Sequence, residues 1–292
     1  MTGGGARFGQ MAFAAPQKSL GSTLRQGAAG AMRMTKNNGI EAQTTRFVRR
    51  LNDLYIGTSV TLAALALQRE QIEGGKKHWI NFTVPSGGER ASANIRRNQK
   101  QMTTMIDQMI AGGERSKALL VAVSIAEDYL LNVLKLLLRA YPARMNRGIR
   151  GGETETAVPL AELLSKDRED ILEERIQARL NRALYSSPAD YLTYLRDVLE
   201  IDIPEERSAQ FIEIKASRDI IIHANGRIND KYLEKSGDLA RGAVGDPLPV
   251  DQDYFDRSIA AMKLFMFDIG RAIDAKYGQD EIVKACLLRF DA

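Results

Sequence analysis

The stretch SKALLVAVSIAEDYLLNVLKLLLRAY, residues 116–141, decides the fold class. Its apolar side chains recur every three or four residues, at Leu119, Val123, Ala126, Leu130, Val133 and Leu137. This spacing is typical of one face of an α-helix. A second row runs beside the first and consists of Leu120, Glu127, Leu131, Leu134 and Leu138. An apolar surface this wide predicts a helix that is buried between neighbours in a bundle.

Most of the remaining chain also shows helical spacing. Candidate start and stop residues bound these segments, such as Ser187-Pro188 before one helix and Gly278 after another. We expect further helices over 41–73, 91–111, 169–185, 187–200, 204–225 and 251–277. For 78–84 a short strand and an extended loop both remain open. The sequence therefore predicts an all-α fold built as a helical bundle.

Composition divides the chain into four predicted regions. Up to Tyr55 there are eight basic residues against two acidic ones, so the overall net charge of +4 reflects the N-terminal part. We expect a disordered basic tail over 1–40. An acid-free start with arginines also resembles a transit peptide, which stays as an alternative for this tail. A helical region of unknown role over 41–112, the main bundle over 113–280 and a C-terminal tail over 281–292 should follow.

The chain is expected to be a soluble cytoplasmic protein without a membrane segment. Its single cysteine, Cys286, excludes an internal disulfide framework and fits a reducing compartment. No apolar stretch approaches the roughly 20 residues that a membrane helix needs. Two histidines and one cysteine, far apart in the sequence, form no recognisable set of metal ligands. We therefore expect neither a metal nor another cofactor.

The segment SRDIIIHANG, residues 217–226, carries the candidate chemistry. Arginine is always cationic and binds phosphate through two N–H groups, while histidine exchanges a proton near neutral pH. On an ideal helix Arg218 and His223 are offset by about 140°, whereas Asp219 and His223, four residues apart, face the same way. We therefore predict that Asp219 accepts a hydrogen bond from the imidazole and fixes its tautomer.

The three isoleucines between Arg218 and His223 leave a strand as the alternative for this segment, because β-branched residues favour strands. A strand would place the two side chains on opposite faces. The helical spacing of Phe211, Ile214 and Ile221 favours the helix.

This segment and its surroundings resemble the HEPN superfamily. The resemblance rests on Arg218, the polar Asp219, three apolar residues and His223, followed by Asn225, Gly226, Asn229, Tyr232 and Leu233. It extends to the helix with Ala126–Leu130 and to the closing helix from Asp251, and it covers about 114–277. The hallmark of the superfamily is an arginine four to six residues before a histidine, near a helix end. The resemblance implies a helical bundle of HEPN type over 113–280.

The resemblance also implies a metal-independent endoribonuclease, of the kind that often serves as a toxin or an antiviral defence effector. Such proteins usually form homodimers in which two Arg–His motifs share a composite active site. RNA, a second copy of the chain and a neutralising or regulatory protein are therefore the expected partners. We expect His223 to take a proton from a ribose 2′-OH, and Arg218 to stabilise the negative charge that develops on the attacked phosphorus.

Several further residues are assigned to the site. Glu127 lies in line with apolar residues, so its carboxylate needs a cationic partner, and Arg218 is the candidate. We predict a structural or orienting role for Glu127. Asn225, Arg227 and Lys231 follow the motif and are predicted to contact RNA, with a plain solvated loop as the alternative.

Two segments before the main bundle have open interpretations. The basic residues Arg96, Arg97 and Lys100, with Arg90 before them, either steer RNA or form a solvated face. Earlier in the chain, His78 and Trp79 follow Lys76 and Lys77 and suggest base stacking, but ordinary packing is the interpretation that we favour.

Two alternatives to the ribonuclease stay open. One is a catalytically inactive HEPN-like module that dimerises and binds RNA or a protein. The other is a helical phage or host interaction protein in which the motif is coincidental. In that case His223 would be a core histidine bonded to Asp219.

Overall fold

The computed structural model describes residues 39–75, 79–86, 92–147 and 158–290. The predicted disordered tail lies outside these residues, apart from Gly39 and Ile40. The described chain is predominantly helical with one two-stranded sheet, which confirms the all-α prediction in its coarse form. Its elements are α1 (Ile40–Gly74), β1 (Trp79–Pro85), β2 (Ser92–Asn98), α2 (Gln99–Gln108), the π-helical turn η1 (Met109–Gly113), α3 (Glu114–Ala140), η2 (Pro142–Asn146), α4 (Leu160–Ser165), α5 (Arg168–Leu184), α6 (Pro188–Leu199), α7 (Glu205–His223), α8 (Asp230–Ser236), η3 (Gly237–Leu239), α9 (Gln252–Tyr277) and α10 (Glu281–Phe290).

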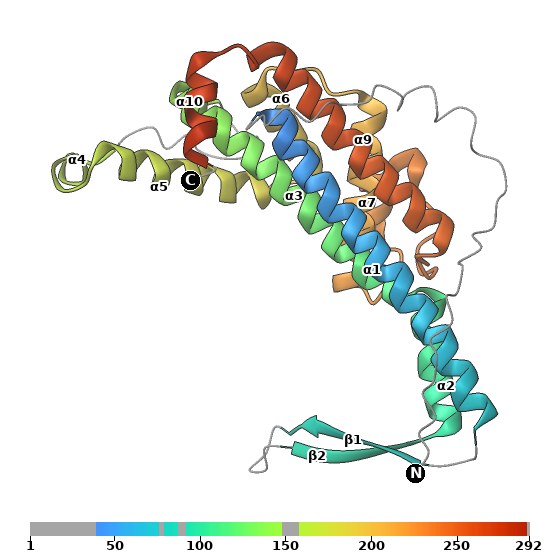
Figure 1. Ribbon diagram of the computed structural model, residues 1–292. Coiled ribbons are helices and arrows are strands. Elements are labelled where there is room, and N and C mark those ends of the chain that lie inside the picture. The colour runs from blue at the N-terminus through green and yellow to red at the C-terminus, as the bar shows by residue number, and fades with distance from the viewer. Residues whose placement is uncertain (1–38, 76–78, 87–91, 148–157, 291–292) are drawn as a thin grey trace, which may run out of the picture. The chain divides into compact units, whose positions relative to one another are not determined.

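Helix α3 is the centre of the bundle (Figure 1). It contacts α1, α5, α6, α7, α9 and α10. The apolar row predicted from the sequence is buried throughout, and none of its six side chains is more than 2% exposed. Because each buried leucine contributes roughly 1.5–3 kcal/mol, this one helix supplies much of the apolar free energy of the core.

The first half of α1 belongs to the same core as α3. Phe47 and Leu51 are buried in it, and α1 contacts both α3 and α9. The helices α1 and α9 approach so closely that a Cβ at Gly270 would lie 2.4 Å from the Thr44 hydroxyl oxygen. The predicted boundary between 41–112 and 113–280 is therefore wrong, because apolar spacing identifies the buried face of a helix but not its partner.

The predicted C-terminal tail over 281–292 is also wrong for most of its length. Residues 281–290 form α10, which contacts α3. Val283 and Leu287 are buried in the main core. This helix begins only a few residues after α9 ends, and Asp280 caps it by accepting hydrogen bonds from the amides of Ile282 and Val283.

A β-hairpin replaces the start of the helix predicted over 91–111. Strand β2 pairs antiparallel with β1, with Trp79 opposite Asn98 and Pro85 opposite Ser92. Of the two interpretations open for 78–84, the strand is therefore correct from Trp79 onward. Asn98 then starts α2 through a capping box, in which its side chain and that of Gln101 exchange hydrogen bonds with each other's backbone.

The candidate motif from Arg218 to His223 forms the C-terminal end of helix α7, so the predicted helical form is present. Asn225 and Gly226 adopt positive φ angles of 49° and 70°, which stop the helix just after His223. The amide of Gly226 donates to the carbonyl of Ile220 at 3.1 Å. The strand alternative for this segment is therefore excluded.

Buried Glu213 fixes α7 to the elements that follow it. Its carboxylate accepts hydrogen bonds from the hydroxyls of Ser217, Tyr232 and Tyr254 at 2.8–2.9 Å, and from Arg241 Nε at 3.2 Å. Burial and the charge of Glu213 together raise the pKa of Tyr254. This network ties α7 to α8, to the following loop and to α9, so the end of α7 has a defined position.

Candidate functional site

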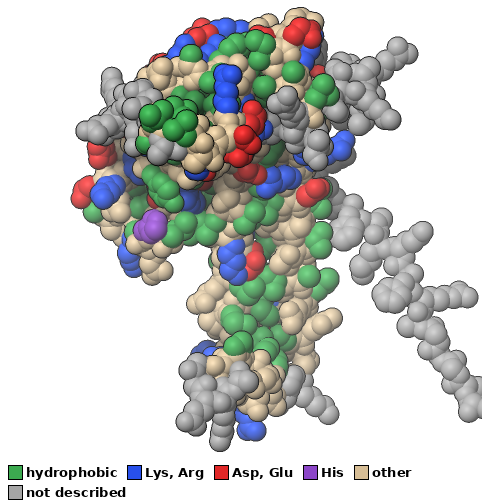
Figure 2. Space-filling view, turned by 90° about the vertical axis from the view of Figure 1, so that its left-hand side faces the viewer, with side chains coloured by type: hydrophobic (Ala, Val, Ile, Leu, Met, Phe, Trp, Pro, Cys, Tyr) green, Lys and Arg blue, Asp and Glu red, His purple; other side chains and the backbone are tan. Residues whose placement is uncertain are grey.

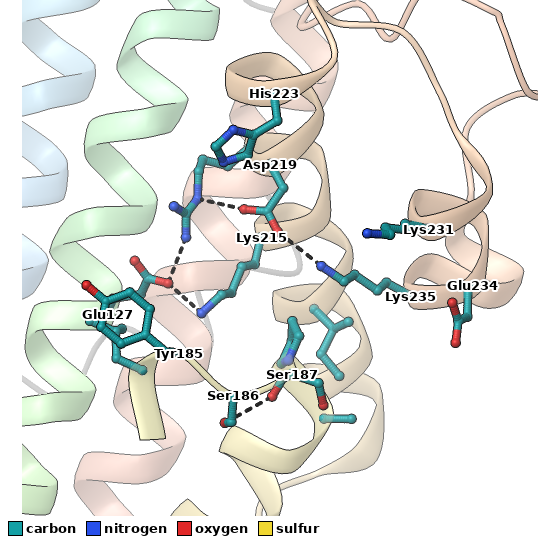
Figure 3. Close-up of a pocket in the computed structure, with 15 residues that line it drawn as sticks. Glu127, Tyr185, Ser186, Ser187, Lys215, Asp219, His223, Lys231, Glu234 and Lys235 are labelled. Atoms are coloured by element: carbon teal, nitrogen blue, oxygen red, sulfur yellow. Dashed lines mark hydrogen bonds and ion pairs between the residues drawn. The ribbon is translucent and has the colours of Figure 1, made fainter. Parts of the chain in front are cut away.

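A cavity of about 840 Å³ opens beside the C-terminal half of α7 (Figure 3). Its walls come from α7, from α8, from Glu127 on α3 and from the junction between α5 and α6. The ionisable residues that line it are Lys215, Arg218, Lys231, Lys235, Glu127, Asp219, Glu234, Tyr185 and His223. Four lysine and arginine side chains face three carboxylates, so the cavity has a small positive excess before the histidine is counted.

The largely buried carboxylate of Glu127 orients Arg218. Glu127 Oε1 accepts a hydrogen bond from Arg218 Nη2 at 2.8 Å and lies 2.6 Å from Lys215 Nζ. The side chains of Glu127 and Lys215 are only 12% and 7% exposed. Lys215 Nζ also lies 5.4 Å from the ring centre of Tyr191, whose pKa is raised by burial and by the charge of Glu127. The predicted contact between Glu127 and Arg218 is thus present, and Lys215 is a second cation on the same oxygen.

Two of the three guanidinium nitrogens of Arg218 make no hydrogen bond to a described residue. Its Nε lies 3.4 Å from Asp219 Oδ1, as an ion pair without hydrogen-bond geometry. Its Nη1 makes no hydrogen bond to the residues that the structure describes. Lys235 Nζ lies 3.2 Å from Asp219 Oδ2, so a second cation stands on this wall of the cavity. A phosphate oxygen that entered here would meet two charge-assisted donors.

His223 occupies the exposed end of this arrangement. It lies in the last turn of α7, is exposed and lines the cavity. The predicted hydrogen bond from its imidazole to Asp219 is wrong. The Asp219 carboxylate instead faces Arg218 and Lys235, and cations hold a carboxylate more strongly than a neutral imidazole does. The alternative of a buried core histidine is excluded by the exposure of His223.

The three residues predicted to contact RNA have different positions. Lys231, on α8, is exposed and lines the cavity. Asn225 and Arg227 are not among its lining residues. Asn225 ends α7 in the left-handed conformation, while Arg227 Nη1 donates to the carbonyl of Gly245 at 2.9 Å and ties the following loop together. Only Lys231 of the three is therefore placed to meet a ligand in this cavity.

Several residues that line the cavity were not predicted from the sequence. Lys215 precedes Arg218 by three residues, so helical spacing alone places both on one face, and this pattern offered a way to find it. Lys235 and Tyr185 come from other elements and reach the cavity only through the tertiary fold. Tyr185 is 88% exposed at the junction of α5 and α6, where its ring is available for stacking.

Comparison of the chain with protein-family models, with curated proteins and with solved structures finds no match. The resemblance to the HEPN superfamily thus stays a prediction from the motif and its helical surroundings. In the described ranges, no three histidine, cysteine, aspartate or glutamate side chains gather in a way that could hold a metal ion. None of the helices described is both long and apolar enough to cross a membrane.

Proposed function

We propose that this protein is a metal-independent endoribonuclease whose Arg218 and His223 act on an RNA phosphodiester in the cavity beside α7. The proposal rests on the hydrogen bonding of these two side chains. Arg218 is oriented by Glu127 while its Nη1 stays open, and His223 lines the same cavity without a hydrogen bond to a described residue. A cation with an open donor and an unpaired imidazole are the groups that 2′-OH attack requires.

In the proposed reaction, His223 takes the proton of a ribose 2′-OH, and the 2′-oxygen forms a bond to the adjacent phosphorus. The bond from phosphorus to the 5′-oxygen breaks, and that oxygen receives a proton. Arg218 stabilises the negative charge on the phosphorane through Nη1. The products are a 2′,3′-cyclic phosphate and a free 5′-OH. A second His223 from a homodimer would serve as the acid, since one imidazole per chain does not act as base and acid in one step.

The lysines of the cavity would bind the RNA backbone in this proposal. Lys231 is exposed at the cavity, and Lys235 is a third exposed in its side chain. Each would contact a phosphate and hold the chain in register, without reading the base. A toxin or antiviral role under the control of a neutralising protein is part of the same proposal.

An RNA with a single deoxyribose provides the test. The protein is incubated in EDTA with a single-stranded RNA and with matched copies in which one nucleotide at a time lacks the 2′-OH. The proposal predicts that each copy loses cleavage only at the bond 3′ to its deoxyribose. Cleavage of an all-DNA copy at an equal rate would contradict it, because DNA offers no 2′-OH.

A non-catalytic module that dimerises and binds RNA or a protein is the second candidate. It is favoured by the extent to which carboxylates already neutralise the cavity, since Glu127 contacts Lys215 and Arg218, and Asp219 contacts Arg218 and Lys235. In that case RNA or partner binding would persist in both the parent and a His223→Ala variant, with no cleavage by either.

A further inference from the structure

The β-hairpin presents a polar face that no function proposed above uses. Opposite residues of an antiparallel pair share a face, and successive residues alternate between faces. The register therefore places Trp79, Asn81 and Thr83 with Asn94 and Arg96 on one face. The hydroxyl of Thr83 donates to the side-chain oxygen of Asn94 at 3.1 Å, which confirms that these two lie together.

The other face of the hairpin is apolar and partly anchored. It carries Ile80, Phe82 and Val84 opposite Arg97, Ile95 and Ala93. Ile80 packs against the small cluster of Ile72, Met102 and Ile106 between α1 and α2. This contact holds the base of the hairpin and leaves its polar face toward solvent.

Trp79 is the most unusual residue on the polar face. It is the only tryptophan of the chain, and it is 60% exposed. Tryptophan is highly buried on average in folded proteins, so the exposure of this ring sets it apart and makes it accessible to a partner. A flat aromatic ring is the platform on which a nucleic acid base stacks.

The hairpin and the start of α2 carry exposed cations, and the register places Arg96 on the same face as Trp79. Arg96 and Arg97 on β2 and Lys100 at the start of α2 are all exposed. In the described part of the chain, none of these three forms an ion pair with a carboxylate. Blue side chains show at the lower end of the view in Figure 2, where the hairpin lies. On the polar face, an aromatic ring, three side-chain amide or hydroxyl groups and the cation of Arg96 together match a single nucleic acid strand.

We propose that the polar face of the β-hairpin is a binding site for single-stranded RNA, in which Trp79 stacks on a base and Arg96 contacts a phosphate. The hairpin holds no residue of the cavity beside α7, so it is a second contact with the nucleic acid. The choice of RNA rather than DNA rests on the proposed function, but binding to the hairpin does not depend on cleavage.

The single tryptophan makes the test direct. The full-length His223→Ala variant, which leaves RNA intact, is titrated with a 12-nucleotide single-stranded RNA while tryptophan fluorescence is recorded. Stacking on Trp79 predicts saturable quenching. Binding of labelled RNA is then measured by anisotropy in four further variants made in the same background, and circular dichroism checks that each is folded.

The four variants form two matched pairs across the hairpin. Trp79→Ala and Arg96→Gln change the polar face, while Phe82→Ala and Arg97→Gln make the same kinds of change on the opposite face. The proposal predicts that Trp79→Ala weakens binding at least about fivefold. Arg96→Gln should reduce the slope of log Kd against log salt by about 0.7, the value for one phosphate on a single strand. Phe82→Ala and Arg97→Gln should leave binding within twofold of their parent.

Three results would overturn the proposal. If Arg96→Gln and Arg97→Gln weaken RNA binding equally, the RNA is attracted by net charge and does not bind one face of the hairpin. Absence of quenching would exclude stacking on Trp79. A change in sedimentation by Trp79→Ala without a change in RNA binding would assign the face to self-association. Cleavage by the parent chain in the absence of quenching would leave the proposed ribonuclease intact, and quenching without cleavage would leave only the hairpin site.

Discussion

Replacing Glu127 by glutamine should destabilise the protein more than any other single carboxylate-to-amide change in the cavity. Glu127 lies 2.6 Å from Lys215 Nζ and 2.8 Å from Arg218 Nη2, and its side chain is 12% exposed. The substitution keeps the shape of the side chain and removes its charge. Lys215, which is only 7% exposed, would then lose its carboxylate partner, and Arg218 would keep only Asp219, 3.4 Å from its Nε.

The expected cost follows from this burial. Removing one partner of a buried ion pair costs about 3–5 kcal/mol, and the glutamine carbonyl can still accept one hydrogen bond, so we expect about 3 kcal/mol. The neighbouring residue provides the matched control. Asp128 pairs with Arg50 at 2.7 Å, but both side chains are 48% exposed, so Asp128→Asn should cost less than about 1 kcal/mol.

Urea unfolding followed by circular dichroism at pH 7 measures both changes. We expect Lys215→Met in the Glu127→Gln background to recover part of the loss, because it removes the buried uncompensated charge. Equal free energies of unfolding for Glu127→Gln and Asp128→Asn would contradict this expectation. They would mean that the Glu127 cluster is hydrated and that Arg218 is not held by a buried carboxylate.

Two further predictions concern stability away from the cavity. Gly270→Ala should lower the free energy of unfolding by about 1–3 kcal/mol, since its Cβ would lie 2.4 Å from the hydroxyl oxygen of Thr44. Gly57→Ala, whose Cβ would have nothing within 4 Å, should raise the free energy of unfolding by about 0.5–1 kcal/mol. Thermal unfolding of the two variants checks both signs. The Glu200 carboxylate has its pKa lowered from 4.5 to about 2, mainly by its hydrogen bond from Arg147. Its contribution is therefore present above pH 4.5 and lost as the pH falls toward 2, so Glu200→Gln should flatten the stability profile in that window, and an unchanged profile would contradict the assignment.

The main helices could be predicted from the sequence because their cores are periodic. The apolar row from Leu119 to Leu137 has one consistent spacing, and it is buried as that spacing requires. The same logic placed Glu127 on a buried flank and named Arg218 as its partner, and the two are in contact. A charged residue inside an apolar row needs a partner of opposite charge, and this requirement can be stated from the sequence alone.

The remaining features depend on contacts that spacing does not encode. The hairpin was taken in part for a helix, because β2 owes its form to pairing with β1 rather than to its own composition. The hydrogen bond predicted between Asp219 and His223 is absent because Lys235, sixteen residues later, reaches Asp219 through the fold. Likewise, α10 packs into the main core through Val283 and Leu287, and the sequence of a short segment does not show which core it joins.

RNA cleavage in EDTA by the parent chain and by two histidine variants decides whether His223 is catalytic. His223 is exposed, so His223→Ala should change stability by no more than about 0.5 kcal/mol, and His78→Ala serves as the control at the other histidine. We expect fragments with 2′,3′-cyclic phosphate ends from the parent and from His78→Ala, and none from His223→Ala. Cleavage by folded His223→Ala at the rate of the parent would contradict it.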